Sequence, residues 1–131
     1  MIINHNAGIA PVTVHPDLFE LIELGKTHSL LQPSNLDIAI GPLVQSWRIG
    51  FEDAKVPDKE NIQKAIALAN PEHIILNAAE KSVFLNHKGM KIDLGALAKG
   101  YIADKIMDYL KTENVSSAMI NRWWQCPCLW R

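Results

Sequence analysis

Apolar side chains recur at helical spacing in three parts of the chain. The pattern predicts helices over residues 16–31, 59–69 and 98–111. The first begins with Pro16, which suits a first helical turn, and the second follows Asp58, a residue type that caps helix starts. In the third, apolar residues recur at i, i+4, i+7 and i+8 from Ile102, the spacing of one helical face. We therefore expect three helices separated by shorter elements.

Between these helices the pattern changes to short extended runs bounded by turn residues. It predicts strands at residues 36–40, 73–76, 82–85, 90–93 and 115–120, and a loop at residues 48–58. The run at 36–40 meets Gly41 and Pro42, which indicate a turn. The next three runs have short connections typical of a meander. Strands grouped between helices favour an α+β fold with a mixed or antiparallel sheet and flanking helices.

Composition adds that the chain is globular. Its 131 residues suit one domain, with 48% hydrophobic and 21% charged residues. A net charge of −1 argues against binding to nucleic acid through charge. The chain shows no export signal, lipoprotein cysteine or apolar run of transmembrane length, so a cytoplasmic location is expected if it is expressed as it stands.

The segment at residues 93–104, which reads Asp-Leu-Gly-Ala-Leu-Ala-Lys-Gly-Tyr-Ile-Ala-Asp, carries the strongest chemical signal. It joins a predicted strand to a predicted helix, and its glycines allow a tight turn or a close approach of backbone. Lys99 arrives at the first predicted helical turn, where backbone N–H groups and the helix dipole favour an anion. Asp93 and Asp104 are acceptors for a ribose, a ring N–H or a metal. The pattern indicates a site for a phosphorylated cofactor. The structural alternative is a loop with a solvated lysine, since the segment matches neither common glycine-rich nucleotide motif.

Three motifs, in order along the chain, resemble those of one family. Residues 3–8 read Ile-Asn-His-Asn-Ala-Gly, residues 36–50 begin Leu-Asp-Ile-Ala-Ile-Gly-Pro-Leu-Val, and residues 93–104 form the segment above. They are similar to the Ile-Asn-x-x-Ala-Gly, Phe-Asp-Ile-Thr-Val-Gly-Pro-Leu-Val and Asp-x-Gly-x-x-Ala-Lys-Gly-Tyr-x-x-Asp segments of the FAD:protein FMN transferase family, ApbE, long called thiamine biosynthesis lipoprotein. Residues 117–121 resemble the strand before that family's Gly-Gly-Asn turn.

The resemblance implies an enzyme and a reaction. Members of this family depend on Mg²⁺ and transfer FMN from FAD to a threonine of a target flavoprotein, releasing AMP. FAD, Mg²⁺ and a flavoprotein with an acceptor threonine are therefore the expected cofactors and partner. The resemblance also implies an ApbE-like, T-fold-like sheet with flanking helices, here incomplete. Two alternatives stay open, a flavin-binding fragment without catalysis and a pseudogene product without function.

The resemblance assigns flavin contacts to Asn35, Leu36, Asp37, Asp93 and Lys99. Lys99 is expected to pair with a cofactor phosphate or to orient the flavin, and the Asp93 carboxylate to accept a hydrogen bond from the isoalloxazine or the ribose. Leu36 stands where the family has an aromatic residue, which weakens a stacking role. Ala96 is expected to offer its backbone carbonyl to Mg²⁺, a hard cation that prefers oxygen. No residue is assigned as the general base.

Both ends of the chain depart from the family pattern. Met1 stands almost on the first motif, whereas family members carry an upstream export signal or lipoprotein anchor that places them at the membrane or in the cell envelope. Three of the 4 tryptophans and both cysteines lie in residues 123–130. The codons of that stretch, read one nucleotide later, can restore the family's glycine-rich turn.

We therefore expect residues 1–121 to be the central part of an ApbE-like domain and residues 122–131 to be a frameshifted tail. In that case the strand at 115–120 loses the partner strand that follows it in the family. The nucleotide sequence of the locus decides this question.

Overall fold

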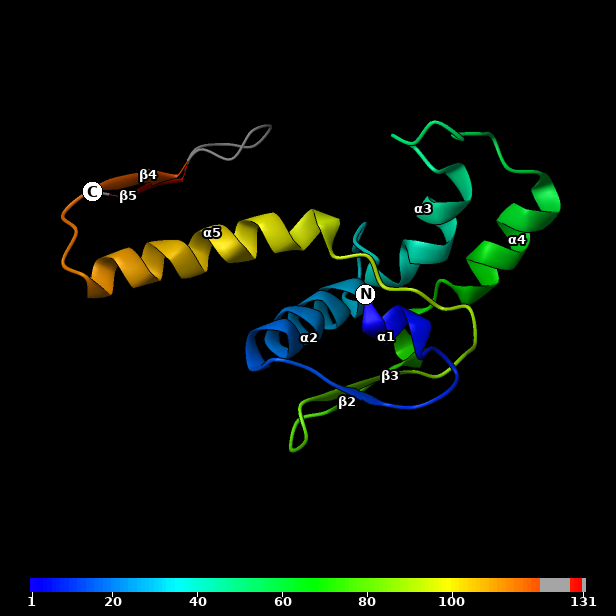
Figure 1. Ribbon diagram of the computed structural model, residues 1–131, viewed down its shortest axis with the longest axis horizontal. Coiled ribbons are helices and arrows are strands. Elements are labelled where there is room, and N and C mark those ends of the chain that lie inside the picture. Colours follow the sequence, from blue (N-terminus) through cyan, green and yellow to red (C-terminus); the bar gives the residue numbers. More distant parts are fainter. Residues whose placement is uncertain (121–127, 131) are drawn as a thin grey trace. The chain divides into compact units, whose positions relative to one another are not determined.

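The computed structural model describes residues 1–120 and the backbone of residues 128–130. The chain forms two compact units, Met1–Leu94 and Gly95–Arg131. In the first unit the elements are α1 (Ile2–His5), β1 (Val12–Thr13), α2 (Pro16–Leu30), the 3₁₀ helix η1 (Ile38–Ile40), α3 (Gly41–Trp47), α4 (Lys59–Leu68), the 3₁₀ helix η2 (Pro71–His73), β2 (Ile74–Asn77) and β3 (Ser82–Leu85) (Figure 1). In the second they are α5 (Gly95–Thr112), β4 (Ala118–Ile120) and β5 (Cys128–Trp130).

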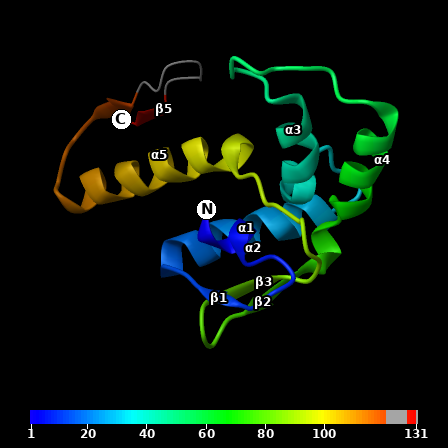
Figure 2. The same ribbon diagram turned by 45° about the vertical axis from the view of Figure 1, so that its right-hand side comes forward.

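The first unit is built on an antiparallel sheet of order β1-β3-β2, with α1 and α2 on one of its faces (Figures 1 and 2). The β2–β3 hairpin is confirmed. The third strand of the predicted meander is wrong, because β1 pairs with β3 through Val12 and Val83, and residues 90–93 run extended outside the sheet. The largest fully buried side chains of this core are Ile3, Phe19, Ile22, Ile38, Ile74, Val83, Leu85 and Met90.

Two of the predicted helices form where the sequence placed them. α2 starts at Pro16, and the buried Phe19, Leu21 and Ile22 face the core. α4 is capped by Asp58, whose carboxylate accepts a hydrogen bond of 2.8 Å from the backbone N–H of Asn61. These helices were predictable because their start signals are local.

The strand predicted at residues 36–40 is wrong, since the chain there forms η1 and runs directly into α3. Asp37 explains the difference: its Oδ1 accepts a hydrogen bond of 2.7 Å from the N–H of Ala39, which bends the backbone into a 3₁₀ turn. Ile38 and Ala39 are both buried, whereas neighbouring residues of a half-buried strand point to opposite faces. Pro42 then lies in the first turn of α3 instead of ending a strand.

The segment at residues 86–94 forms no strand of the sheet. The side chain of Asn4 pairs with its backbone in place of a neighbouring strand. Asn4 donates from Nδ2 to the carbonyl of Ile92 at 3.2 Å and accepts from the N–H of Ile92 at 2.9 Å. The asparagine amide therefore acts like the backbone of a neighbouring strand. Ile92 and Met90 are buried on the same side of the extended segment, with exposed fractions of 3% and 0%.

Two glycines let other backbone come close to this segment. Gly8 has a φ of +72°, donates to the carbonyl of Leu85 at 2.8 Å, and would place a Cβ 2.5 Å from the backbone N of Lys88. Gly41 has an ordinary φ, but a Cβ there would lie 2.5 Å from the carbonyl oxygen of Lys91. Through these two glycines, the first two motifs of the sequence thus pack against the extended backbone of residues 88–92.

In the second unit, α5 starts three residues before the predicted position, at Gly95, and contacts β4. Its buried residues are Ala103 and Met107, while Ile102 and Ile106 of the predicted apolar face are 43% and 41% exposed. β4 pairs antiparallel with β5, so the expectation of a strand without a partner is wrong for residues 118–120. The rest of the predicted frameshifted tail, residues 122–127 and 131, lies outside the described residues, as does residue 121 of the predicted ApbE-like part.

Replacing Asn4 should destabilise the first unit more than replacing the neighbouring Asn6. In Asn4→Ala the buried N–H and C=O of Ile92 lose their partner, and we expect a loss of about 1–3 kcal/mol in the free energy of unfolding. Asn6→Ala is the matched control, because its amide makes one exposed bond to the carbonyl of Ile2. Urea denaturation measures both, and equal losses would contradict the role given to Asn4.

Alanine substitutions at three glycines separate close approach from backbone conformation. Gly50 has a φ of +89° and open space around it, so Gly50→Ala should cost only the conformational strain, about 1–3 kcal/mol. Gly41→Ala should destabilise although its φ is ordinary, because of the contact with Lys91, and Gly8→Ala should cost the most, because it combines both effects. Thermal denaturation of the three variants ranks them, and a Gly50 variant less stable than the Gly8 variant would refute the packing argument.

Candidate functional site

One hydrogen bond joins two of the segments that the sequence assigned to the flavin. The backbone N–H of Asp93 donates to the carbonyl of Ile38 at 2.8 Å, which brings Asp93 beside the end of the 35–37 segment. Asn35 is exposed, while Leu36, Asp37 and Asp93 are half-buried and partly open to solvent. Four of the five predicted flavin-contact residues therefore belong to one region of the first unit.

Within this region the Asp37 carboxylate stabilises the local backbone. Its Oδ1 is engaged by the N–H of Ala39, so this oxygen shapes the turn that carries Leu36 and Ile38. Nearby, Ser29 on α2 accepts from the N–H of Ile38 at 3.0 Å and donates to the carbonyl of Gly25 at 2.7 Å. The turn is thus stabilised by the Asp37 side chain and by Ser29 of α2.

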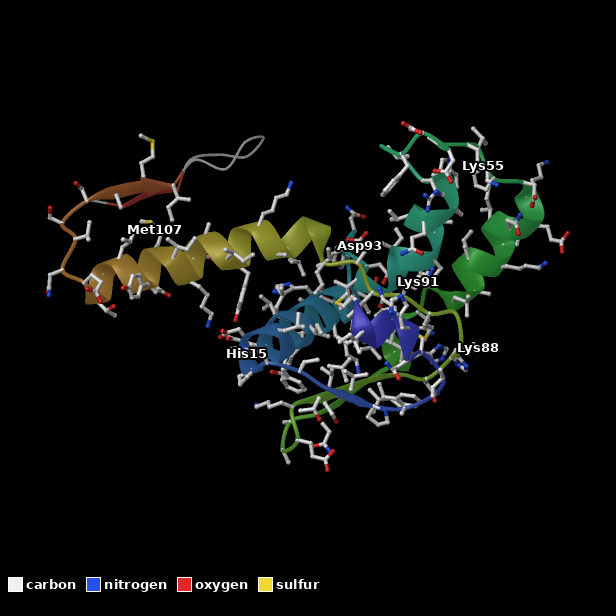
Figure 3. The ribbon with its side chains drawn as sticks, viewed as in Figure 1. His15, Lys55, Lys88, Lys91, Asp93 and Met107 are labelled. Atoms are coloured by element: carbon white, nitrogen blue, oxygen red, sulfur yellow. The ribbon has the colours of Figure 1, made fainter. Side chains whose placement is uncertain are left out.

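The approach to Asp93 is fixed against α3. Gly41 packs on the backbone of Lys91, and the Lys91 ammonium donates a hydrogen bond to Oε1 of Gln45, one turn further along α3. Figure 3 shows Lys88, Lys91 and Asp93 in succession along the extended segment. The position of residues 91–93 is therefore fixed by one contact of the Lys91 backbone and one of the Lys91 side chain.

Ala96 and Lys99 belong to α5, in the second unit. Ala96 lies in the first turn, where backbone N–H groups have no acceptor within the helix and the dipole favours an anion. Lys99 is the fifth helical residue, so the prediction that it stands in the first turn is wrong by part of a turn, because the helix begins at Gly95. Both residues are exposed.

The described residues do not form a magnesium site by themselves. Among residues 1–120, whose side chains the structure describes, no three His, Cys, Asp or Glu side chains gather where they could hold a metal ion. The carbonyl of Ala96 is one oxygen, and Mg²⁺ takes six ligands in near-octahedral geometry.

The sequence did not predict a cleft in the first unit. It encloses about 600 Å³ between α3 and α4 and is lined by Pro42, Gln45, Ser46, Arg48, Lys55, Val56, Pro57, Asp58, Asn61, Lys64, Ala65 and Leu68. None of the predicted flavin-contact residues lines it. At its edge Arg48 contacts Asp53 at 2.6 Å and lowers the pKa of that carboxyl below its ordinary value. The sequence signal that could have found this cleft is the pair of helix starts at Pro42 and Asp58, separated by a loop rich in exposed apolar residues.

None of the helices in the described part of the chain is long and apolar enough to cross a membrane.

Comparison with known proteins gives a consistent result at three levels. The sequence model described as the ApbE family matches residues 1–122. A protein of Klebsiella pneumoniae (strain 342) named FAD:protein FMN transferase is 50% identical over 121 residues, which are 92% of this chain and 38% of that protein. A protein of the same name from Treponema pallidum (strain Nichols) is 35% identical over 91% of this chain and 34% of its own length. The chain thus spans less than two-fifths of the length of these relatives.

Solved structures agree on the fold. The ApbE protein of Thermotoga maritima superposes with a TM-score of 0.82 at 24% identity, over 92% of this chain and 39% of that one. The apo form of a Pseudomonas stutzeri flavinyl transferase superposes with a TM-score of 0.80 at 23% identity, over 92% and 38%. At these identities the likeness shows the α+β fold, which confirms the predicted fold class.

Two substitutions of Asp37 distinguish its capping role from a role of its charge. Asp37→Ala removes the acceptor for the Ala39 N–H and should lower the free energy of unfolding by about 0.5–2 kcal/mol, whereas Asp37→Asn keeps an acceptor and should lose a few tenths. Urea denaturation gives the two values. Flavin binding measured on the stable Asn variant then reports on the charge alone, and an Asn variant as unstable as the Ala variant would contradict the cap.

Proposed function

Because this chain belongs to the ApbE family, we propose that it carries part of the flavin site of an FAD:protein FMN transferase. The observation that supports this most directly is the bond from the Asp93 N–H to the Ile38 carbonyl. Two motifs far apart in sequence share one region through this bond, and they are the motifs that the resemblance assigns to the flavin.

The proposed reaction moves FMN from FAD to a protein. The hydroxyl oxygen of an acceptor threonine attacks the phosphorus on the FMN side of the diphosphate, a new phosphoester bond forms, and the bond to the AMP phosphate breaks. The threonine proton passes to a general base that we do not assign, and AMP leaves with the bridging oxygen and its electron pair.

We propose distinct tasks for the residues of this chain. The Asp93 carboxylate accepts a hydrogen bond from the flavin ring or the ribose, and the backbone of residues 35–37 forms the adjoining wall. Lys99 and the first turn of α5 favour the negative charge of the cofactor phosphates. Leu36 contacts the flavin through apolar surface, since a leucine cannot stack as an aromatic ring does.

Magnesium binding through the Ala96 carbonyl stays a prediction of the resemblance, because one backbone oxygen is too few ligands for this cation. The identity of the flavoprotein that receives FMN also stays open. We keep the non-catalytic flavin-binding fragment as the second candidate, because the described residues provide no assigned base.

Flavin binding by the full chain tests the proposal. FAD titration followed by flavin fluorescence should give saturable binding, and Lys99→Ala and Asp93→Ala should each weaken it about tenfold, the effect of losing one charge-assisted hydrogen bond. Lys111→Ala, on the last turn of the same helix, and His87→Ala, in an exposed turn, are the controls and should change the affinity less than about twofold. Unchanged FAD affinity in both Lys99→Ala and Asp93→Ala would contradict the proposed flavin site.

A chimera tests the reaction itself. The matching region of the Klebsiella pneumoniae relative is replaced by residues 1–121 of this chain, and FMN transfer to that relative's acceptor protein is followed by in-gel flavin fluorescence together with AMP release. Transfer that falls about tenfold or more in the Lys99→Ala chimera, but not in the Lys111→Ala chimera, supports the enzyme. FAD binding without AMP release in the chimera would favour the non-catalytic alternative.

A further inference from the structure

We propose that the cleft between α3 and α4, together with the apolar side chains beside it, is the docking surface for an acidic, partly apolar segment of a protein partner. The identification of that partner as the protein that receives FMN rests on the proposed function. The docking itself rests on the exposed apolar residues, the charges of the cleft and its connection to Asp93.

Apolar side chains are exposed in unusual concentration on α3 and the loop that follows it. They are Val44, Ile49, Phe51 and Val56, with exposed fractions of 45%, 78%, 63% and 84%. A separate hollow of about 210 Å³ on the same helix is lined only by Leu43, Val44, Trp47 and Ile49. Val56 lines the cleft itself, and exposed apolar side chains beside a cleft are typical of a protein interface.

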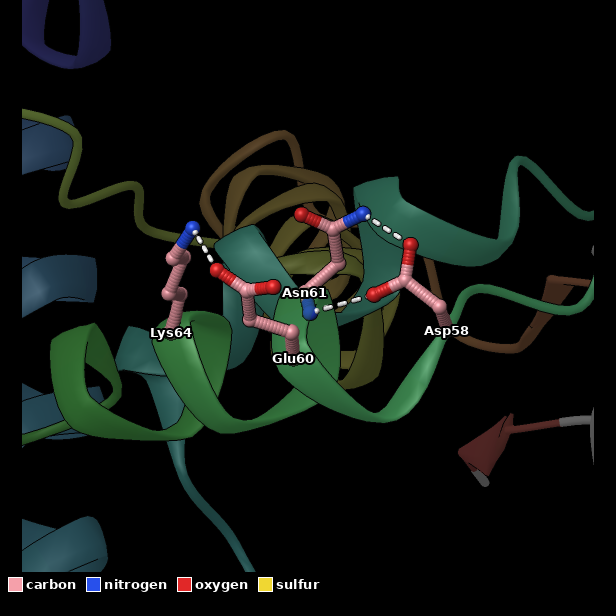
Figure 4. Close-up of polar contacts among 4 residues, drawn as sticks. All are labelled: Asp58, Glu60, Asn61 and Lys64. Carbon is pink, nitrogen blue, oxygen red and sulfur yellow. Dashed lines mark hydrogen bonds and ion pairs between the residues drawn. The ribbon is translucent and has the colours of Figure 1, made fainter.

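The charge of the cleft determines the kind of partner. Its lining contains three cations, Arg48, Lys55 and Lys64, and one acid, Asp58. Both carboxylate oxygens of Asp58 are engaged by Asn61, one by its N–H at 2.8 Å and one by its amide at 2.7 Å (Figure 4). Both oxygens of this acid are therefore occupied by the helix cap, and the lining holds three cations against its one negative charge.

Two of the three cations can turn toward an external carboxylate, because Arg48 is already paired with Asp53 at 2.6 Å. Within the described part of the chain Lys55 has no ion pair, and it lies on the loop before α4 (Figure 3). Lys64 pairs with Glu60 at 2.6 Å, but the two side chains are 68% and 77% exposed. Such exposed pairs contribute at most about 1 kcal/mol, so a carboxylate of a partner can compete for the lysine. Glu60 itself does not line the cleft.

The cleft adjoins the segment that leads to Asp93. Gln45 lines the cleft and accepts the hydrogen bond of Lys91, and Pro42 lines it directly after Gly41, which packs on the Lys91 backbone. A segment seated in the cleft therefore lies beside residues 91–93. This neighbourhood is the reason to identify the occupant with a protein that must present a side chain near bound flavin.

Peptide binding to the full chain, without FAD, tests the docking. The probe is a fluorescein-labelled peptide of about twelve residues in which glutamates alternate with leucines, and the comparison peptide has lysines in place of the glutamates. We expect fluorescence anisotropy to show saturable binding of the acidic peptide, at least about tenfold tighter than the basic one and weakened by salt.

The matched variants separate charge from general damage. The double variant Lys55→Glu/Lys64→Glu should weaken the acidic peptide at least about tenfold, and Lys59→Glu, on the same helix but outside the cleft, less than about threefold. Val56→Ser, at an exposed apolar residue that lines the cleft, should weaken binding without changing its salt dependence. Circular dichroism confirms that each variant is folded.

Several outcomes overturn the proposal. They are no binding of the acidic peptide, equal binding of both peptides, or equal effects of the double variant and Lys59→Glu. Sedimentation that shows a dimer of the chain abolished by Val56→Ser would identify a second copy as the occupant instead. Because the probe contains no flavin, its failure alongside normal FAD binding would reject the docking surface alone, and the reverse result would reject the flavin site alone.

Discussion

The placement of Asp93 depends on one asparagine side chain that replaces a missing strand. Residues 86–94 leave the sheet after β3, so their backbone groups lack a ladder, and buried groups without partners are costly. Asn4 satisfies both backbone groups of Ile92 at once, and the N–H of the next residue is satisfied by Ile38. An amide side chain suits this task because it has a donor and an acceptor at the spacing of a peptide group.

The fold could be predicted from sequence where its signals are local. Pro16 marks a helix start through its fixed φ, and Asp58 marks one through its bond to the N–H of Asn61. The β2–β3 hairpin follows from two short runs with a short connection. The prediction failed at residues 36–40, where the Asp37 carboxylate competes with the extended backbone and wins. β1 has only two residues, too few for any pattern, and it exists because β3 offers it an edge.

The flavin-contact residues stay a prediction of the resemblance, and the contacts that position four of them could not be predicted from the sequence. Motif resemblance singled out Asn35, Leu36, Asp37 and Asp93, and the structure brings them to one region. It gave no reason for Asn4, Gly8 or Gly41, because their role is a contact with residues far along the chain. The α3–α4 cleft escaped prediction for the same reason, since it exists only once two helices pack together.

Gly8 and Gly41 contact the backbone of the extended segment. The position of this segment and the charge of its side chains can therefore be altered separately. Gly8 and Gly41 approach the main chain at residues 88 and 91, which is the same for every amino acid except proline. The end of the Lys88 side chain can therefore be exchanged to alter the surface potential near the flavin region while the course of the chain stays fixed, whereas the Lys91 ammonium also bonds to Gln45 and helps to hold the segment. Any alteration of the glycines, in contrast, displaces the segment whatever charges it carries. The charge at position 88 can therefore be changed by substitution without moving the main chain, because the contacts of Gly8 and Gly41 determine where the main chain lies.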